Sequence, residues 1–213
     1  MRMRKKKNGG KRLLACDEHY IQNAADYKGK WNSLFENDNP IHIEIGCGKG
    51  RFITESAKLN PDINYIAIDV VADVLVLAAE KAKAQGIENV KFILADAKLL
   101  CDIFEDGEIS LIYLNFSDPW HKKRHYKRRL TYKDFLMVYV KILKKGSPIF
   151  FKTDNRNLFE FSLNSFCDNN FKLHNITLDL HNSDFEGNVM TEYEERFSSE
   201  GNPIYRLEAT YNY

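Results

Sequence analysis

The fold is decided by the stretch Ile41-His-Ile-Glu-Ile-Gly-Cys-Gly-Lys-Gly50. Its first five residues are rich in isoleucine and predict a buried strand, and three glycines follow within five residues. Glycine lets the backbone turn tightly and approach a ligand closely, where a Cβ atom would obstruct it. An apolar period typical of a helix then runs from about Arg51 to Leu59. The stretch therefore predicts a strand, a glycine-rich loop and a helix in that order.

Strands and helices continue to alternate beyond this stretch. Alternation of this kind indicates a parallel sheet covered by helices on both faces. The last part of the chain differs, because strands 171–180 and 204–211 are joined by a polar stretch, which predicts an antiparallel hairpin at the sheet edge. The expected fold is α/β, with a mostly parallel sheet of about seven strands. The remaining predicted elements are strands 65–70, 90–94, 109–115 and 148–152 and helices 71–85, 98–103, 132–144 and 158–168.

The composition is typical of a water-soluble globular protein, with 213 residues of which 44% are hydrophobic. Domains run to roughly 100 to 200 residues, so a chain of this length supports one self-sufficient core. No apolar run approaches the ~18 residues of a membrane span, and none follows the basic start as in a signal peptide. The four cysteines form no C-x-x-C pair, which indicates a reducing compartment. We expect a cytoplasmic protein with no membrane association and no structural metal.

Basic residues are concentrated in two segments. Residues 1–12 hold seven and residues 119–133 hold another seven, with no acidic residue in either segment. Outside these segments 17 basic residues face 30 acidic ones, a net charge of −13. Local potential steers binding, so this segregation favours a polyanionic partner. The alternative is a solubilising tail and a solvated helix face. We expect residues 1–16 to form a flexible basic arm and residues 17–213 to form a single domain.

Acidic residues stand at three successive strand ends. Glu44 precedes the first glycine by two residues, Asp69 ends the second strand, and Asp96 follows the third. Ligands of open α/β sheets bind where strand carboxyl ends meet helix N-termini. A dinucleotide site would read G-x-G-x-x-G, but residue 51 is Arg. Glu44 suits a cationic ligand such as S-adenosylmethionine, Asp69 suits ribose hydroxyls, and Asp96 suits an adenine amino group. Each acid could alternatively be a helix N-cap, and the loop a structural turn.

The fourth strand is followed by Phe-Ser-Asp-Pro-Trp-His-Lys-Lys-Arg-His-Tyr-Lys-Arg-Arg, residues 116–129. The basic run thus begins at the strand end where a substrate should meet the methyl donor. Pro119 rigidifies the turn and restricts Asp118 to extended geometry. The basic side chains suit phosphates, and the aromatic ones could stack a base. His121 and His125 are four residues apart without a third ligand, so we expect no metal site.

This combination resembles the bacterial tRNA (guanine-N7-)-methyltransferases, which belong to the S-adenosylmethionine-dependent Rossmann-like class. The resemblance covers nearly the whole chain, and Asp-Pro-Trp followed by a basic run is its most specific part. Two positions depart from the family pattern, because His121 stands where Pro is usual and Asp69 stands where Glu is usual. The segments that carry it are Glu44–Gly50, Ser117–His125, Lys127–Thr131, Thr153–Asn155, Thr191–Arg196 and Gly201–Ile204.

The resemblance implies methyl transfer from S-adenosylmethionine to N7 of guanosine in tRNA, expected at position 46 of the variable loop, with Asp118 at the reacting base. The cofactor residues that it implies are Glu44, Gly46, Gly48, Gly50, Asp69, Asp96, Ala97 and Asp118. The guanosine residues are Lys122, Asp154, Thr191, Glu192, Tyr193 and Glu194. The RNA-binding residues are Arg124, His125, Tyr126, Lys127, Arg128 and Arg129.

Guanine N7 carries a free lone pair, so its attack on a methyl group needs no prior removal of a proton. We expect Asp118 to act by orienting the base and offsetting positive charge, a task shared with Asp154 and Glu194. The acid-rich residues 191–195 could alternatively form a charged edge loop. Two other functions stay open: a methyltransferase acting on a different RNA base, and a non-catalytic RNA-binding protein. The sequence leaves the oligomeric state open between monomer and homodimer.

Overall fold

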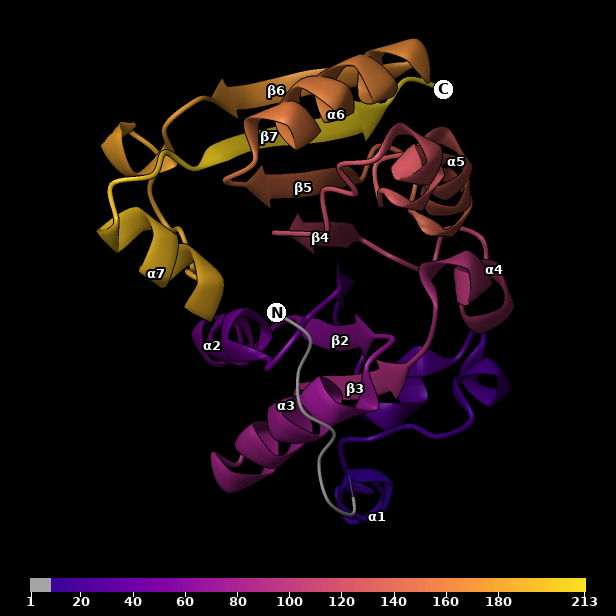
Figure 1. The fold of residues 1–213 in the computed structure, drawn as a ribbon. Coiled ribbons are helices and arrows are strands. Elements are labelled where there is room, and N and C mark those ends of the chain that lie inside the picture. The colour runs from indigo at the N-terminus through magenta and orange to yellow at the C-terminus, as the bar shows by residue number, and fades with distance from the viewer. Residues whose placement is uncertain (1–8) are drawn as a thin grey trace.

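The computed structural model describes residues 9–213, and its centre is a seven-stranded sheet with the order β3-β2-β1-β4-β5-β7-β6 (Figure 1). Strands β1 to β5 are parallel, and β7 runs antiparallel to both of its neighbours. The predicted fold class, a mostly parallel sheet with an antiparallel edge pair, is confirmed. The strands are β1 Ile41–Ile45, β2 Asn64–Asp69, β3 Val90–Leu94, β4 Leu111–Asn115, β5 Pro148–Thr153, β6 Phe171–Thr177 and β7 Tyr205–Tyr211.

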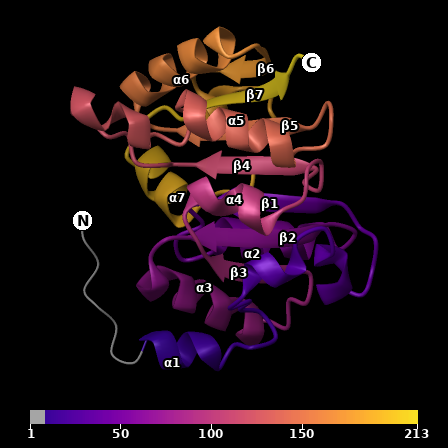
Figure 2. The ribbon, with the colours of Figure 1, turned by 90° about the vertical axis from the view of Figure 1, so that its right-hand side faces the viewer.

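Helices cover both faces of the sheet (Figure 2). Side chains alternate across a strand, so Ile66 and Ile68 of β2 join one core with α4, α5 and α6, whereas Tyr65 and Ala67 join a second core with α1, α2 and α3. Within residues 9–213 we find no helix with the length and apolar character of a membrane span. The helices are α1 Gly9–Leu14, α2 Arg51–Leu59, α3 Ala72–Ala84, α4 Leu100–Ile103, α5 Lys133–Ile142, α6 Arg156–Asp168 and α7 Glu192–Ser199.

Some boundaries differ from the predicted ones for local reasons. The strand predicted from residue 109 begins at Leu111, because Ile109 instead forms an isolated bridge to Leu143. The strand predicted to reach residue 180 ends at Thr177, after a register shift that begins at His174. The polar stretch between the last two strands contains helix α7. Turns of 3-10 helix occur at η1 Ala24–Tyr27, η2 Trp31–Leu34, η3 Ala97–Leu99, η4 Lys123–Arg128 and η5 Leu180–Asn182.

The N-terminal segment also differs from its prediction as a flexible arm over residues 1–16. Residues Gly9–Leu14 form α1, and the side chains of Leu13 and Cys16 are buried in the core shared with α3. The Arg12 guanidinium pairs with Glu80 of α3 at 2.6 Å. Apolar burial and this ion pair fix the second half of the predicted arm. Residues 1–8 lie outside the described residues, and the assignment of residues 17–213 to one domain stays a prediction.

Candidate active site

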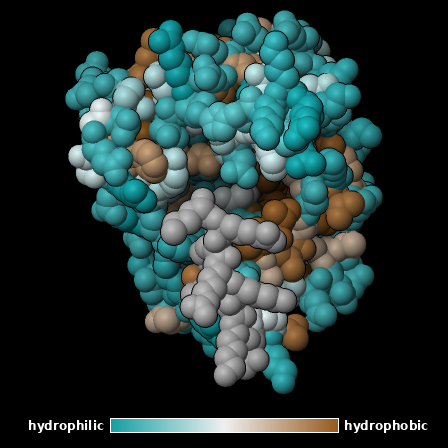
Figure 3. Space-filling view, viewed as in Figure 1, coloured by the Kyte–Doolittle hydropathy of each residue, from teal (hydrophilic) through white to brown (hydrophobic). Residues whose placement is uncertain are grey.

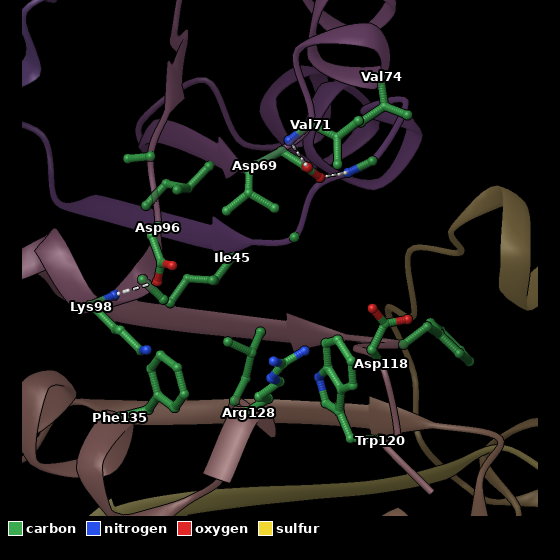
Figure 4. A pocket seen from close by; sticks show the side chains of 18 residues that line it. Ile45, Asp69, Val71, Val74, Asp96, Lys98, Asp118, Trp120, Arg128 and Phe135 are labelled. Carbon is green, nitrogen blue, oxygen red and sulfur yellow. Dashed lines mark hydrogen bonds between the residues drawn. The ribbon is translucent and has the colours of Figure 1, made fainter. Parts of the chain in front are cut away.

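A cavity of about 650 Å³ lies at the carboxyl ends of β1, β2, β3 and β4 (Figure 4). Binding sites for small molecules typically enclose ~300 to 1,000 Å³. The cavity is mostly apolar, with the carboxylates of Asp69, Asp96 and Asp118 around it, and Figure 3 shows a hollow bordered by hydrophobic surface. Its lining comprises Ile45, Gly46, Gly48, Ile68, Asp69, Val70, Val71, Val74, Ala95, Asp96, Ala97, Lys98, Phe116, Asp118, Trp120, Arg128, Leu130 and Phe135.

The glycine loop after β1 forms one wall of this cavity. Gly46 and Gly48 line it with φ of +84° and +56°, in the left-handed region where a residue with a Cβ atom is strained. Gly50 is not part of the lining. A Cβ atom on Gly50 would come within 2.5 Å of the Ala78 Cβ atom, so this glycine lets α2 pack closely against α3. Gly50 was expected to contact the cofactor, but it lies outside the cavity lining. Its missing side chain instead allows the two helices to pack closely.

Glu44 lies in β1, two residues before the glycine loop, and only 1% of its surface is exposed. Asn115 at the end of β4 donates a hydrogen bond to its Oε1 atom at 2.9 Å, whereas Oε2 is buried without a partner in the described part of the chain. Burial raises the pKa of Glu44 to about 8. The carboxyl group is not part of the cavity wall, but a buried acid of this kind would be stabilised in its ionised form by a nearby cation.

Asp69 and Asp96 bind the backbone at the next two strand ends. Asp69 accepts hydrogen bonds from the backbone N–H groups of Gly48 at 2.9 Å and Val71 at 2.8 Å, one on each oxygen. Asp96 accepts from the N–H of Lys98 at 3.0 Å and so caps η3. The helix-cap alternative is therefore correct for Asp96. Both side chains also line the cavity, and a carboxylate oxygen can accept a second hydrogen bond from a ligand hydroxyl or amino group.

The turn after β4 carries unusual backbone angles on both sides of Asp118. The φ angle is +51° at Phe116 and +45° at Trp120, values that are uncommon for residues other than glycine. Strain of this kind persists only where the surrounding structure enforces it, and it clusters at functional sites. Asp118 is exposed, and Asp118 and Trp120 both line the cavity (Figure 4). The turn thus holds an accessible carboxylate at the edge of the cavity.

Most of the basic run is exposed, as a phosphate-binding surface requires. Arg128 places its guanidinium 4.9 Å from the centre of the Trp120 ring and also lines the cavity. The His125 ring meets the same indole edge-on, with 5.7 Å between ring centres. These contacts place the basic run directly beside the cavity. The exposed basic side chains are Lys122, Lys123, Arg124, Lys127 and Arg128.

Arg129 departs from this pattern, because only 3% of its surface is exposed. Its guanidinium lies 3.7 Å from the Tyr126 ring centre and 4.4 Å from that of Phe161, and its Nε atom donates to the carbonyl oxygen of Pro119 at 2.8 Å. The structure thus places Arg129 in the protein interior, and its expected contact with RNA stays a prediction. Stacking on the two aromatic rings buries the Arg129 side chain, whereas the neighbouring basic side chains are exposed.

The end of β5 and helix α7 form the side of the site assigned to guanosine. The Tyr193 hydroxyl lies 3.4 Å from Oδ2 of Asp154 and donates to it. The Tyr193 ring packs against Phe116 with 5.3 Å between centres. Because Phe116 belongs to the turn after β4, the structure brings Asp118, Asp154 and Tyr193 to one edge of the sheet.

Three side chains assigned to the guanosine pocket instead fix helix α7. Thr191 caps the helix, since its Oγ1 atom accepts from the N–H of Glu194 at 2.9 Å. Glu194 is fully buried and accepts from Nζ of Lys152 at 2.7 Å. Glu192 pairs with Lys81 of α3 at 3.1 Å. The Glu194 carboxylate is thus engaged by side chains within residues 9–213, and its contact with a base stays a prediction. The charged-loop alternative is wrong, because these residues form a helix.

Sequence reasoning missed Lys152 and Asn115, which are 5% and 6% exposed. Besides Glu194, Lys152 binds the carbonyl oxygen of Val189 at 3.0 Å. A lysine inside the apolar strand β5 signals a buried partner, because lysine is almost never buried unpaired. The spacing of Thr191 and Glu194 likewise matches the S/T-x-x-E pattern that starts helices. Apart from its place at a strand end, nothing in the sequence identified Asn115 as a residue of the site.

Comparison with known proteins agrees with this geometry. A family described as "Putative methyltransferase" matches residues 38–207, and the fold and cavity define a methyltransferase of the α/β class. Curated relatives named tRNA (guanine-N(7)-)-methyltransferase are 57% identical in Bacillus subtilis (strain 168), over 98% of both chains, and 54% identical in Streptococcus pneumoniae (strain 70585), over 99% of this chain and 100% of the relative. The chain belongs to the family of tRNA (guanine-N(7)-)-methyltransferases.

Solved structures share the fold at low sequence identity. The 16S rRNA methyltransferase KamB is 14% identical with a TM-score of 0.66, over 87% of this chain and 94% of that one. A structure described as an antibiotic related methyltransferase is 19% identical with a TM-score of 0.61, over 85% and 91% of the two chains. These similarities establish the fold alone.

Proposed function

We propose that this chain transfers a methyl group from S-adenosylmethionine to N7 of a guanosine in tRNA, giving 7-methylguanosine. The observation that carries the proposal is the 57% identity, over 98% of both chains, to a relative named for this reaction. The site supports it independently, because a cavity lined by carboxylates adjoins an exposed basic run. A non-catalytic RNA-binding protein would need the basic run but has no use for the cavity.

The residues around the cavity fit S-adenosylmethionine. Glu44 is not part of the cavity wall, but its Oε2 atom, which has no partner within residues 9–213, suits a cationic group bound nearby. The mostly apolar walls suit an adenine ring. Asp69 and Asp96 supply acceptors for ribose hydroxyls and an adenine amino group. Among residues 9–213, a Cβ atom added to Gly46 or Gly48 would meet nothing within 4 Å, so these residues leave open space beside the cavity. When bound, the cofactor supplies a methyl group activated by its sulfonium.

The reaction requires the protein to position the guanine rather than to transfer a proton. Guanine N7 is already a lone-pair donor, and methylation leaves the base positively charged. In our proposal Asp118 orients the guanine and offsets this charge from the edge of the cavity. Asp154 and Tyr193 form the opposite side of the base site in this proposal. The Tyr193 hydroxyl donates a hydrogen bond to the Asp154 carboxylate. Glu194 anchors α7 through Lys152.

The RNA is bound, in this proposal, by the exposed residues Arg124, Lys127 and Arg128, which suit the phosphates of tRNA. Lys122, which is also exposed, stays assigned to the guanosine. His125, edge-on to Trp120, completes this surface. We expect the target to be position 46 of the variable loop, by resemblance to the family. The cysteine usage, which indicates a reducing compartment, supports work in the cytoplasm.

Methyl transfer from labelled S-adenosylmethionine to unmodified tRNA transcripts tests the function. The product is mapped by borohydride and aniline cleavage, which cuts at 7-methylguanosine. We expect a single cut in the variable loop. Labelled tRNA without a cut would move the target to another atom, and tight tRNA binding without label would favour the non-catalytic alternative.

A further inference from the structure

Arg129 connects three parts of the molecule that meet at the active site. Its guanidinium is held between Tyr126 of η4 and Phe161 of α6, at 3.7 Å and 4.4 Å from the ring centres. Its Nε atom donates to the Pro119 carbonyl oxygen at 2.8 Å. Pro119 is the residue between Asp118 and Trp120. A single side chain therefore ties the turn that carries Asp118 to the surface of α6.

The two aromatic rings and the carbonyl oxygen around residue 129 favour arginine for its planar shape as well as for its charge. Burial lowers the pKa of Arg129, and in residues 9–213 no carboxylate pairs with it. A buried cation without such a partner is costly. A planar guanidinium recovers part of this cost by stacking on aromatic faces while it donates a directed hydrogen bond. A lysine ammonium is a point charge on a flexible stem, so it cannot reproduce both contacts at once.

The chain just after Arg129 is hydrogen-bonded to α6, and the turn that contains Pro119 has strained backbone angles. Thr131, two residues on, is fully buried, and its Oγ1 atom lies 2.8 Å from Oγ of Ser162 in α6. Ser165 of α6 donates to the Thr131 carbonyl oxygen at 2.6 Å. The turn on the other side has positive φ angles at Phe116 and Trp120. A conformation of this kind needs support from outside the turn to persist.

We propose that Arg129 is a positioning residue for methyl transfer, which holds the Asp118–Trp120 turn in place by clamping Pro119 to α6. This inference rests on the proposed function and replaces the RNA contact expected for Arg129. The exposed Arg124 and Lys127 bind phosphate without it. A displacement of about 1 Å at a reacting centre can slow a reaction ~100-fold, so loss of the clamp acts on the rate of transfer.

The substitution Arg129→Lys tests the proposal because it keeps the charge and removes the planar clamp. We expect the single-turnover rate at saturating tRNA and cofactor to fall about 10- to 100-fold. The dependence of tRNA affinity on salt should keep its slope, because the substitution keeps the charge. Acrylamide should quench Trp120 more strongly in the variant. Trp31, the second tryptophan, is 0% exposed, so quenching reports on Trp120.

Two further variants sharpen the test. Phe161→Leu removes one wall of the clamp and leaves the basic run intact, so it should show the same pattern even if Arg129→Lys does not fold. Lys127→Ala should show the reverse pattern, a weaker tRNA affinity with a shallower salt slope. A wild-type rate in Arg129→Lys, or unchanged quenching of Trp120 in that variant, would overturn the proposal. The quenching measurement needs no RNA, so it tests the clamp even if the wild-type protein fails to methylate tRNA.

Discussion

The Nζ atom of Lys152 lies 2.7 Å from Oε2 of Glu194, and this buried ion pair joins β5 to helix α7. Lys152 and Glu194 are 5% and 0% exposed, and Nε2 of His181 lies 3.2 Å from Oε1 of Glu194. Burial lowers the pKa of Lys152, and Glu194 opposes that shift. Tyr193, which precedes Glu194, contacts Asp154 and Phe116. The pair therefore fixes the helix that forms one side of the proposed guanosine site.

Breaking this pair from one side should destabilise the protein more than removing it entirely. Lys152→Met or Glu194→Leu alone leaves a buried charge without its partner, and each should lower the free energy of unfolding by about 3 kcal/mol or more. The double variant should lose clearly less than the sum of the two. Urea unfolding measures all three, and strictly additive losses would contradict the prediction. Lys81→Met with Glu192→Leu is the matched control, because this pair is partly exposed and worth at most about 1 kcal/mol.

The sequence predicted the parts of the site that depend on topology. Asp69, Asp96 and Asp118 stand at the carboxyl ends of three parallel strands, β2, β3 and β4, so the shared strand direction brings them to one edge of the sheet. The burial of Arg129 and Glu194 was missed, because each stands in a run of like-charged residues that predicts an exposed surface. Each is buried by partners that lie 32 to 42 residues away, such as Phe161 and Lys152, and only the packing of α6 and α7 reveals them.

Gly50 and Gly46 should respond differently to alanine, although both have positive φ. Gly50→Ala places a Cβ atom 2.5 Å from that of Ala78, so it combines backbone strain with overpacking and should cost about 2 to 4 kcal/mol of unfolding free energy. Gly46→Ala meets no atom within 4 Å and should cost only the strain, about 1 kcal/mol. Urea unfolding compares them. Ala78→Gly should partly restore the Gly50 variant, and no restoration would show that overpacking is not the cause.

Cofactor affinity should depend on pH through Glu44. The pKa of Glu44 is raised from 4.5 to about 8 by burial, so the free protein carries a proton there at pH 7. A cation bound beside it favours the ionised form, so binding releases this proton and should tighten up to tenfold per pH unit as pH rises toward 8. Calorimetry at pH 6.5, 7.5 and 8.5 in two buffers measures affinity and proton release. Glu44→Gln should retain only the titration of the cofactor itself.

The same pKa predicts how the free protein responds to pH, and the sign is the reverse of the usual one for an acid. Because the folded pKa lies above 4.5, the protonated Glu44 contributes stability fully below pH 4.5. That contribution is lost as pH rises through about 8. Urea unfolding without cofactor should give a lower stability at pH 8.5 than at pH 6.5. The difference should shrink in Glu44→Gln, and an equal difference in both proteins would assign it to other groups.

Arg124 and Arg128 should separate RNA binding from cofactor binding. Both are exposed, but only Arg128 lines the cavity and lies over Trp120. Arg124→Ala should weaken tRNA binding, reduce the salt slope by about 1 and leave cofactor affinity unchanged. Arg128→Ala should reduce both affinities. Filter binding across a salt series and cofactor titration measure them, and equal effects of the two variants on the cofactor would contradict the placement of Arg128.

Asp118→Asn should lower the rate of methyl transfer without removing a proton-transfer step. Asp118 stands at the cavity edge, where its charge can orient the guanine and offset the positive charge that forms on it. We expect a single-turnover rate reduced by about 100-fold, in the range measured for other electrostatic groups at active sites. With tRNA and cofactor saturating, the effect of Glu44 on cofactor affinity drops out, so the wild-type rate should be nearly flat from pH 6.5 to 8.5. A wild-type rate that rises tenfold per pH unit through one pKa, together with a flat rate in Asp118→Asn, would show instead that Asp118 removes a proton.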